Sequence, residues 1–286
     1  MHAIIDDIQP VNFHAGEQAR RYLDTLTKPP GSLGALETLA IQLSAITGEL
    51  KPSVMPPAVI VFAADHGVAV EGVSAFPQTV TAQMAANFAQ GGAAVNVFAR
   101  QVGERLEIVD VGIIGDERIP GVINAKVRRG TGNMLEADAM LPEQALAAID
   151  AGVQAVERAI QAGAKCLMVG EMGIANTTAS SAMLAVLTGE PVASLVGAGT
   201  GIDQQQLSHK VTVIERAIAA RNADSEDPLA VLAKLGGLEI AAMTGAYLAT
   251  AKQCLPAIVD GFIATVAALI ACRLSPAVRG YLIFGH

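Results

Sequence analysis

Tryptophan is absent from this 286-residue chain, and aromatic residues make up only 3% of it. Because 52% of the residues are nevertheless hydrophobic, the core must be built from Ala, Val, Leu, Ile and Met. Small aliphatic side chains of this kind suit closely packed layers of helices on a sheet. The 28 glycines are scattered, which is typical of many tight turns between strands and helices. Length and composition indicate one large α/β domain, or such a domain with a small helical appendage.

Basic residues are also scarce: 19 Lys and Arg stand against 27 Asp and Glu, a net charge of −8. Binding to a nucleic-acid backbone requires clustered Lys and Arg, so we expect no nucleic-acid partner. A small anionic substrate remains possible, because a few local donors are enough to bind one phosphate.

Cysteine occurs only at Cys166, Cys254 and Cys272, without the spacing of a metal site, so we expect no metal. The most apolar stretch, residues 261–272, is too short for a bilayer span, which takes ~20 residues. The acidic N-terminus also lacks the features of a signal peptide. We therefore expect a cytoplasmic protein that does not contact membranes.

The first part of the chain differs in pattern from the rest. Residues 1–50 are expected to be helical, with one helix over 17–26 and a second that Ser32 caps. The proline-rich stretch 51–57 is interpreted as a linker. The sequence thus predicts an N-terminal helical segment, 1–50, and a Rossmann-like α/β domain, 51–286.

Beyond the linker, unbroken apolar runs alternate with amphipathic helical stretches. The predicted strands are 58–64, 106–111, 165–169, 192–196 and 256–259. The predicted helices are 80–100, interrupted by Gly91 and Gly92, and 146–160. This alternation indicates a parallel sheet with helices on both faces, which binds its ligands at the carboxyl ends of its strands.

The segment after the third of these strands carries the strongest functional signal. It delivers Glu171 into a glycine turn at Gly173, and the polar Asn176 and Thr177 open the next helix. Backbone amides and the helix dipole at such a turn bind anions. An acid beside an anion is costly unless it has a chemical role, so Glu171 is a catalytic candidate. The alternative is that Glu171 caps the helix or pairs with a lysine.

A glycine-rich loop, 197–201, follows the stretch 192–196, and Lys210 lies shortly after it. Around Gly199 the loop could approach a phosphate closely, with Lys210 as the counter-charge. The alternatives are a plain glycine turn and an ordinary surface lysine. The loop is also an incomplete dinucleotide fingerprint, so an NAD-linked oxidoreductase is the weakest function considered.

Two further features lie near the first predicted strand. Asp65 and His66 at its end could act as an acid–base pair, although a buried histidine that holds a loop is the favoured interpretation. The following loop carries Phe76, which could form a wall for a flat heterocycle.

Several motifs together resemble one family. In chain order they are Lys28-Pro-Pro-Gly-Ser-Leu-Gly, Ala64-Asp-His-Gly-Val, Gly91-Gly-Ala, Asp110-Val-Gly-Ile, Arg129-Gly-Thr-Gly-Asn, Gly170-Glu-Met-Gly-Ile-Ala-Asn-Thr-Thr and Leu255-Pro-Ala-Ile-Val-Asp-Gly-Phe. From about residue 20 to its last residue, the chain resembles the nicotinate-nucleotide–dimethylbenzimidazole phosphoribosyltransferases. The resemblance implies transfer of a phosphoribosyl group from nicotinate mononucleotide to 5,6-dimethylbenzimidazole, for cobalamin biosynthesis. The products are α-ribazole 5′-phosphate and nicotinate.

The resemblance also implies a fold, an assembly and a site. The fold is a parallel, six-stranded Rossmann-like sheet with a small helical domain built from both chain ends, assembled as a homodimer without a metal or redox cofactor. Glu171 would lie near the reacting ribose, and Phe76 and Met84 would line the benzimidazole pocket. The residues that would surround the phosphate and ribose are Gly173, Asn176, Thr177, Gly199 and Lys210.

One family motif is not present. The family's general base is a glutamate in a late Leu-Gly-Glu-Gly motif, whereas this sequence ends at Tyr281-Leu-Ile-Phe-Gly-His286 without it. The expectation is that the family's C-terminal segment is absent and that turnover is very slow. The alternative function is therefore a nucleotide-binding but inactive fragment.

Overall fold

The protein forms a six-stranded sheet in the order β3-β2-β1-β4-β5-β6, with every neighbouring pair parallel. The structure is a computed structural model and describes residues 2–115, 117–197, 199, 201 and 203–286. The strands are β1 Pro57–Ala64, β2 Arg105–Gly112, β3 Ile123–Asn124, β4 Cys166–Met172, β5 Ala257–Val259 and β6 Leu282–Phe284. The predicted parallel α/β sheet is confirmed.

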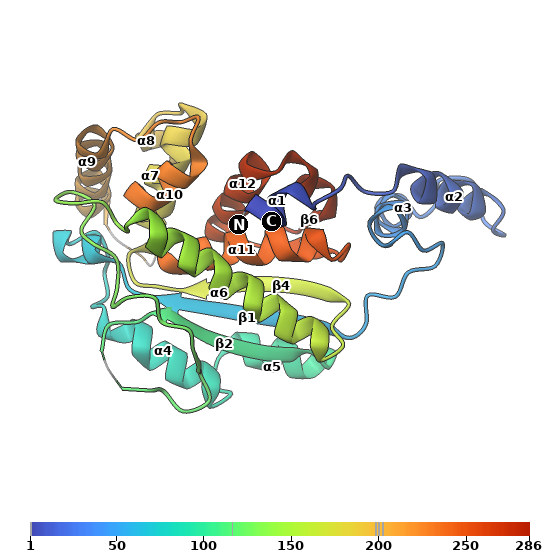
Figure 1. Ribbon diagram of the computed structural model, residues 1–286, viewed down its shortest axis with the longest axis horizontal. Coiled ribbons are helices and arrows are strands. Elements are labelled where there is room, and N and C mark those ends of the chain that lie inside the picture. The colour runs from blue at the N-terminus through green and yellow to red at the C-terminus, as the bar shows by residue number, and fades with distance from the viewer. Residues whose placement is uncertain (1, 116, 198, 200, 202) are drawn as a thin grey trace.

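Helices cover both faces of this sheet, as the sequence predicts. The described helices are α1 His2–Asp6, α2 Phe13–Asp24, α3 Ala35–Thr47, α4 Thr79–Ala89, α5 Ala94–Val102, α6 Pro142–Gln161, α7 Asn176–Thr188, α8 Val192–Leu195, α9 Gln204–Arg221, α10 Pro228–Leu235, α11 Leu238–Lys252 and α12 Phe262–Leu274, with the 3-10 helices η1 Gly67–Glu71 and η2 Pro276–Tyr281. Figure 1 shows α6, α11 and α12 on one side of the sheet and α4 and α5 on the other. None of the described helices is long and apolar enough to cross a bilayer.

The central strands position the site. Every residue of β1 is buried, because helices cover both faces of a parallel sheet. In the β1–β4 register, Phe62 pairs with Glu171 and Ala63 with Met172. The segment after β1, which carries His66, therefore lies beside the turn that follows β4.

One predicted strand is wrong. Residues 192–196 contain the short helix α8, in which the amide of Val196 donates to the carbonyl of Val192 at 3.1 Å. Pro191 precedes the helix, and the Ser194 hydroxyl donates to the Pro191 carbonyl at 2.7 Å. Proline favours a helix start, and this local geometry overrides the β propensity of the valines. The glycine-rich loop therefore follows a helix.

The start of the second N-terminal helix is also corrected. Helix α3 begins at Ala35 with Gly34 as its N-cap, so Ser32 does not cap it. Gly31 and Gly34 both have positive φ, at 71° and 54°, which keeps this segment out of the helix. The Glu37 carboxylate instead accepts a hydrogen bond from the amide of Leu33, ahead of the helix, at 3.1 Å.

The two ends of the chain contact each other. The Tyr281 hydroxyl donates to the Gln9 carbonyl at 2.8 Å, and the Gln42 amide donates to the Leu282 carbonyl at 3.1 Å. Helices α2 and α3 pack on each other at one side of the molecule, whereas α1 packs on α11 (Figure 1). The division into 1–50 and 51–286 stays a prediction.

Helices α6 and α11 cross with their backbones in contact. A Cβ atom added at Gly152 of α6 would lie 1.8 Å from the Ala242 carbonyl oxygen, and one added at Gly245 of α11 would lie 1.9 Å from the Ile149 carbonyl oxygen. Only glycine fits these positions, so the pair determines how closely the two helices pack.

We expect Gly152→Ala to lower the free energy of unfolding by about 3 kcal/mol, because the helices must separate to admit the methyl group. Urea unfolding followed by circular dichroism measures this loss. Gly197→Ala is the matched control, since no atom lies within 4 Å of its added Cβ. If Gly152→Ala unfolds at the wild-type urea concentration, the helix crossing is not as close as described.

Candidate active site

A pocket of about 360 Å³ opens at the carboxyl end of β4. Its wall includes the turn between β4 and α7, and α9 contributes a side chain to it. The predicted residues that line it are Glu171, Gly173, Asn176, Thr177, Gly199 and Lys210. The structure thus brings together every residue that the sequence assigns to the phosphate, the ribose and catalysis.

The turn after β4 has room for glycine only. A Cβ at Gly173 would lie 2.5 Å from the Ala64 carbonyl oxygen and 3.3 Å from Cδ2 of His66. Two residues later, Ala175 takes a left-handed conformation, φ 75°, as the N-cap of α7. The first turn of α7 therefore begins at the pocket wall, where its amides can bind an anion.

Lys210 of α9 supplies positive charge to this pocket. Its side chain is 1% exposed, and its ammonium donates to the Thr177 hydroxyl at 2.7 Å. Burial lowers the pKa of Lys210 to about 8. A bound phosphate would favour the charged form, so Lys210 is suited to pair with a phosphate dianion.

Glu171 supplies the acid. Its carboxylate accepts a hydrogen bond from the Asn176 side-chain amide and is only partly exposed to the pocket. Burial raises the pKa of Glu171 to about 7 and the negative charge of Glu239 adds to this, whereas Asn176 and His66 oppose it. A carboxyl group with this pKa can take up or release a proton near neutral pH.

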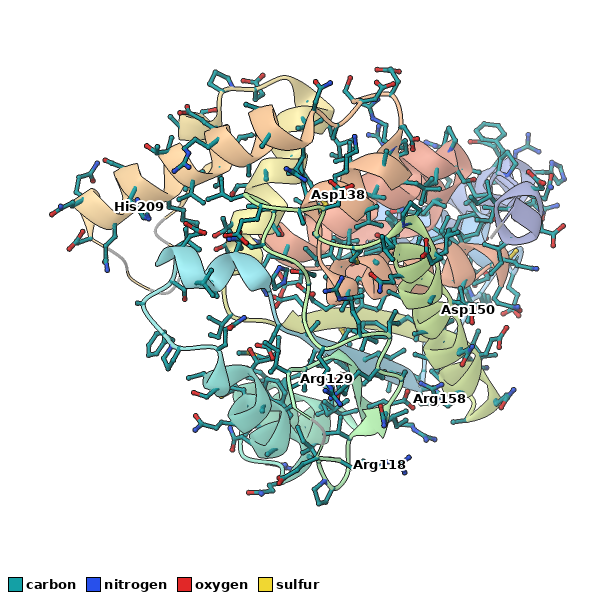
Figure 2. All side chains as sticks on the ribbon, turned by 60° about the vertical axis from the view of Figure 1, so that its left-hand side comes forward. Arg118, Arg129, Asp138, Asp150, Arg158 and His209 are labelled. Carbon is teal, nitrogen blue, oxygen red and sulfur yellow. The ribbon has the colours of Figure 1, made fainter. Side chains whose placement is uncertain are left out.

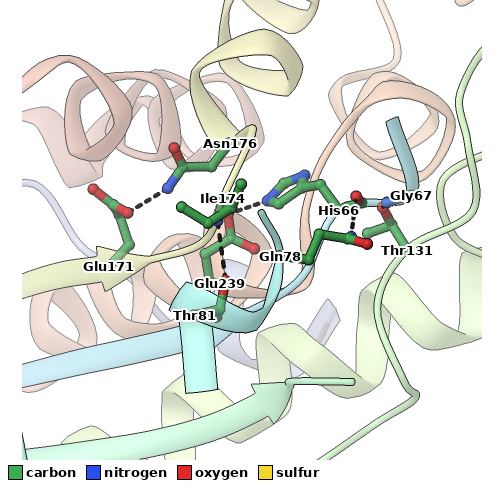
Figure 3. A network of polar contacts seen from close by, with 9 residues as sticks. All are labelled: His66, Gly67, Gln78, Thr81, Thr131, Glu171, Ile174, Asn176 and Glu239. Atoms are coloured by element: carbon green, nitrogen blue, oxygen red, sulfur yellow. Dashed lines mark hydrogen bonds and ion pairs between the residues drawn. The ribbon is translucent and has the colours of Figure 1, made fainter. Parts of the chain in front are cut away.

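A buried ion pair lies behind the turn. Nε2 of His66 is 2.6 Å from Oε1 of Glu239, and both side chains are at most 1% exposed (Figure 3). The His66 carbonyl accepts a hydrogen bond from the Gln78 amide at 2.6 Å. The interpretation of His66 as a buried, loop-holding histidine agrees with this geometry. The sequence prediction missed Glu239 altogether.

The chain was compared with protein families, curated proteins and solved structures. Residues 8–286 match the model of a family described as phosphoribosyltransferase. A protein of Halalkalibacterium halodurans named nicotinate-nucleotide–dimethylbenzimidazole phosphoribosyltransferase is 50% identical over 99% of this chain and 79% of its own length. The chain belongs to the nicotinate-nucleotide–dimethylbenzimidazole phosphoribosyltransferase family. This confirms the resemblance seen in the sequence.

Further relatives agree. A Pseudomonas aeruginosa protein of the same name is 53% identical over 92% of this chain and 75% of its own length. The crystal structure of CobT from Thermus thermophilus has a TM-score of 0.92 at 45% identity, over 96% of this chain and 82% of that one. Membership in this phosphoribosyltransferase family does not support the NAD-linked oxidoreductase considered from the glycine loop.

Family membership leaves some residue roles as predictions. Phe76 is 49% exposed on the loop between η1 and α4, Met84 is partly buried on α4, and neither lines the pocket. Of the loop 197–201, Gly199 lines the pocket, whereas positions 198 and 200 fall outside the described residues. His209 of α9, labelled in Figure 2, lies 2.7 Å from the Glu71 carbonyl oxygen.

A second hollow, of about 340 Å³, lies at the carboxyl end of β2. Its basic lining includes Arg118 and Arg129, which Figure 2 labels, but none of the predicted site residues. There the Lys126 ammonium contacts the Asp110 carboxylate at 3.3 Å, so part of this charge is already paired. Among the described residues, no group of three or more His, Cys, Asp and Glu could hold a metal ion.

Proposed function

We propose that the chain transfers the phosphoribosyl group of nicotinate mononucleotide to 5,6-dimethylbenzimidazole. The observation that carries this proposal is one pocket in which the buried ammonium of Lys210 and the carboxylate of Glu171 both line the wall. A substrate with a phosphate at one end and a developing sugar cation at the other matches this pairing of charges. The names of the relatives support the same substrates.

The phosphate would bind at Lys210, the Thr177 hydroxyl and the first turn of α7. Lys210 and Thr177 already contact each other, so the phosphate meets donors that are in place before it arrives. Binding energy gained at this end of the substrate can hold the ribose in the orientation for attack at its anomeric carbon. Asn176 would keep the Glu171 carboxylate turned toward that ribose.

The reaction exchanges one C–N bond for another. The bond from C1′ to the pyridinium nitrogen breaks, and its electron pair stays on the nicotinate that leaves. A ring nitrogen of the benzimidazole forms the new bond to C1′ from the opposite face, with inversion. Ionised Glu171 would stabilise the positive charge that develops on the ribose.

One proton must leave the acceptor. Bond formation puts the positive charge on the benzimidazole, whose other ring nitrogen then loses its hydrogen. Glu171 is the only acid among the described residues that line the pocket. The late glutamate that the resemblance implies as general base is not among these residues, so we assign Glu171 as the acceptor of this proton, which its pKa of about 7 allows it to pass on to solvent.

We also infer that the reaction uses no redox cofactor, since the exchange of one C–N bond for another consumes no electrons. From the family resemblance we infer a homodimer, and from the sequence a cytoplasmic location. Sedimentation of the purified chain tests the dimer.

Incubation of the purified chain with both substrates tests the activity. We expect equimolar nicotinate and α-ribazole 5′-phosphate, detected by chromatography with mass detection, and an α-linked product by NMR. A reaction without dimethylbenzimidazole is the control and should leave the mononucleotide intact. Failure of a folded chain to consume nicotinate mononucleotide in the presence of the acceptor would contradict the proposal.

A further inference from the structure

The pair formed by His66 and Glu239 is too deeply buried to touch a substrate. Nevertheless it joins two segments that are far apart in the sequence: His66 follows β1, whereas Glu239 lies in the first turn of α11. Figure 3 shows the two side chains beside Ile174, close to the end of β4 that carries Glu171. The pair therefore contacts the pocket wall from the side that faces the protein interior.

Glycines on both sides admit the His66 ring. The Cβ position of Gly173 lies 3.4 Å from Nε2 of His66, and that of Gly237, just before α11, lies 2.5 Å from its Cε1. The same Gly237 position lies 2.7 Å from Oε2 of Glu239. The ring thus lies between the start of α11 and the turn after β4, and a side chain at position 237 would overlap it.

Part of this pair has no hydrogen-bond partner. Nδ1 of His66 and Oε2 of Glu239 are buried and make no hydrogen bond to the described residues. A buried ion pair stabilises a fold most when its remaining polar atoms are also hydrogen-bonded. Buried polar atoms without a hydrogen-bond partner are rare and call for an explanation, such as a functional role. These two atoms lie close to the end of β4, where Glu171 lines the pocket.

We propose that His66 and Glu239 are positioning residues for the transfer reaction: they hold the Gly173 turn against the pocket and place a buried carboxylate behind Glu171. The kinetic part of this inference rests on the proposed function. The pair acts on Glu171 through its charges as well as through its contacts. Glu239 raises the pKa of Glu171, and His66 lowers that pKa by the smaller amount. Glu239 thus helps to keep Glu171 able to take up a proton near neutral pH.

Other titratable groups lie close to His66 and Glu171. Asp65, beside His66, accepts a hydrogen bond from the Ile114 amide at 2.7 Å, and burial raises its pKa. Lys210 lines the same pocket as Glu171. For His66 itself, burial lowers the pKa, but Glu239, Asp65 and Glu171 outweigh it, so the ring stays protonated above the usual range.

Two substitutions separate charge from geometry. In the wild type, kcat should rise with pH as Glu171 loses its proton near pH 7. Glu239→Gln keeps the shape of the side chain and removes its charge, so this rise should move to lower pH by about half a pH unit or more. Glu239→Asp keeps the charge but shortens the side chain, so kcat should fall roughly tenfold to a hundredfold while the rise stays at its wild-type pH. A rise that does not move in Glu239→Gln would overturn the proposal.

Glu107→Gln is the matched control. Glu107 of β2 is also a buried, ion-paired glutamate, 2.6 Å from the Arg158 guanidinium of α6. Its replacement should leave both kcat and its pH dependence unchanged. If it moves the pH dependence as much as Glu239→Gln does, the effect is not specific to the pair and the proposal is wrong.

Two titrations need no turnover and are made on the chain without substrate. Carboxyl NMR should show Glu171 titrating near pH 7 in the wild type and at lower pH in Glu239→Gln. Ring-nitrogen NMR should show His66 protonated above the usual range of histidine; a ring that loses its proton at or below that range overturns the ion pair. This second titration uses the wild type, so it tests the ion pair between His66 and Glu239 even if the variants fail to fold. If the chain makes no product, the proposed function and the kinetic part of the inference fail, and the two titrations still test the ion pair and its effect on the pKa of Glu171.

Discussion

Lys210→Met should weaken the binding of nicotinate mononucleotide about tenfold to a hundredfold, while the affinity for dimethylbenzimidazole changes little. The substitution removes the ammonium that donates to Thr177 at the pocket wall and leaves an apolar side chain of similar length. A hydrogen bond to a charged group contributes about 1.5–3 kcal/mol, which corresponds to this loss. Titration calorimetry with each ligand measures both affinities.

The pH dependence gives a second test of Lys210. Because burial lowers its pKa to about 8, the free protein loses this ammonium above that pH. Affinity for the mononucleotide should therefore fall as the pH rises above about 8 in the wild type, and Lys210→Met should lack this decline. Lys165→Met is the control, since Lys165 is exposed at the opposite end of β4. Equal losses for the mononucleotide and for dimethylbenzimidazole would show that Lys210 is not the phosphate ligand.

The candidate site at the end of β4 could be predicted because its signal is local. Glu171, Gly173, Asn176 and Thr177 lie within a few residues of each other at a strand end, so the position of one strand places them all. Lys210 required only that α9 return to the same edge of the sheet, which the parallel topology favours.

The buried partner of His66 could not be predicted in the same way. Glu239 is 173 residues away in the sequence, and the contact exists only because α11 begins beneath the end of β1. One signal was available: Glu239 is the only charged residue between Lys234 and Lys252. A lone acid in such an apolar helix needs a partner, although the sequence does not say which residue provides it.

The strand assignments failed at two short elements, α8 and β3, although the three-residue strand β5 was predicted. Helix α8 spans four residues, so its periodicity is too brief to compete with the β-forming valines around it. Strand β3 spans two residues and leaves no pattern at all. The long, buried strands β1, β2 and β4 were predicted within a few residues of their observed bounds, because unbroken apolar runs of that length have few other uses.

Glu171→Gln should reduce kcat by a factor of ~10²–10⁴, the usual contribution of a positioned acid or base. The amide keeps the shape of the side chain but can neither stabilise a ribose cation by charge nor accept the acceptor's proton. Because the pKa of Glu171 is raised to about 7, the ionised form accumulates above that pH, so wild-type kcat should rise as the pH increases through 7. In Glu171→Gln this rise should be absent.

Folding stability distinguishes this loss of catalysis from damage to the fold. A carboxyl group whose pKa is higher in the folded chain than in the unfolded chain binds more protons when folded, so its contribution to stability is present at low pH and is lost as the pH rises toward 7. Glu171→Gln removes this loss and should unfold at a higher urea concentration than the wild type at pH 8. Glu190→Gln, at an exposed position after α7, is the control and should match the wild type in both measurements. A Glu171→Gln variant with lower stability and unchanged kcat would mean that this carboxylate supports the fold and takes no part in the transfer.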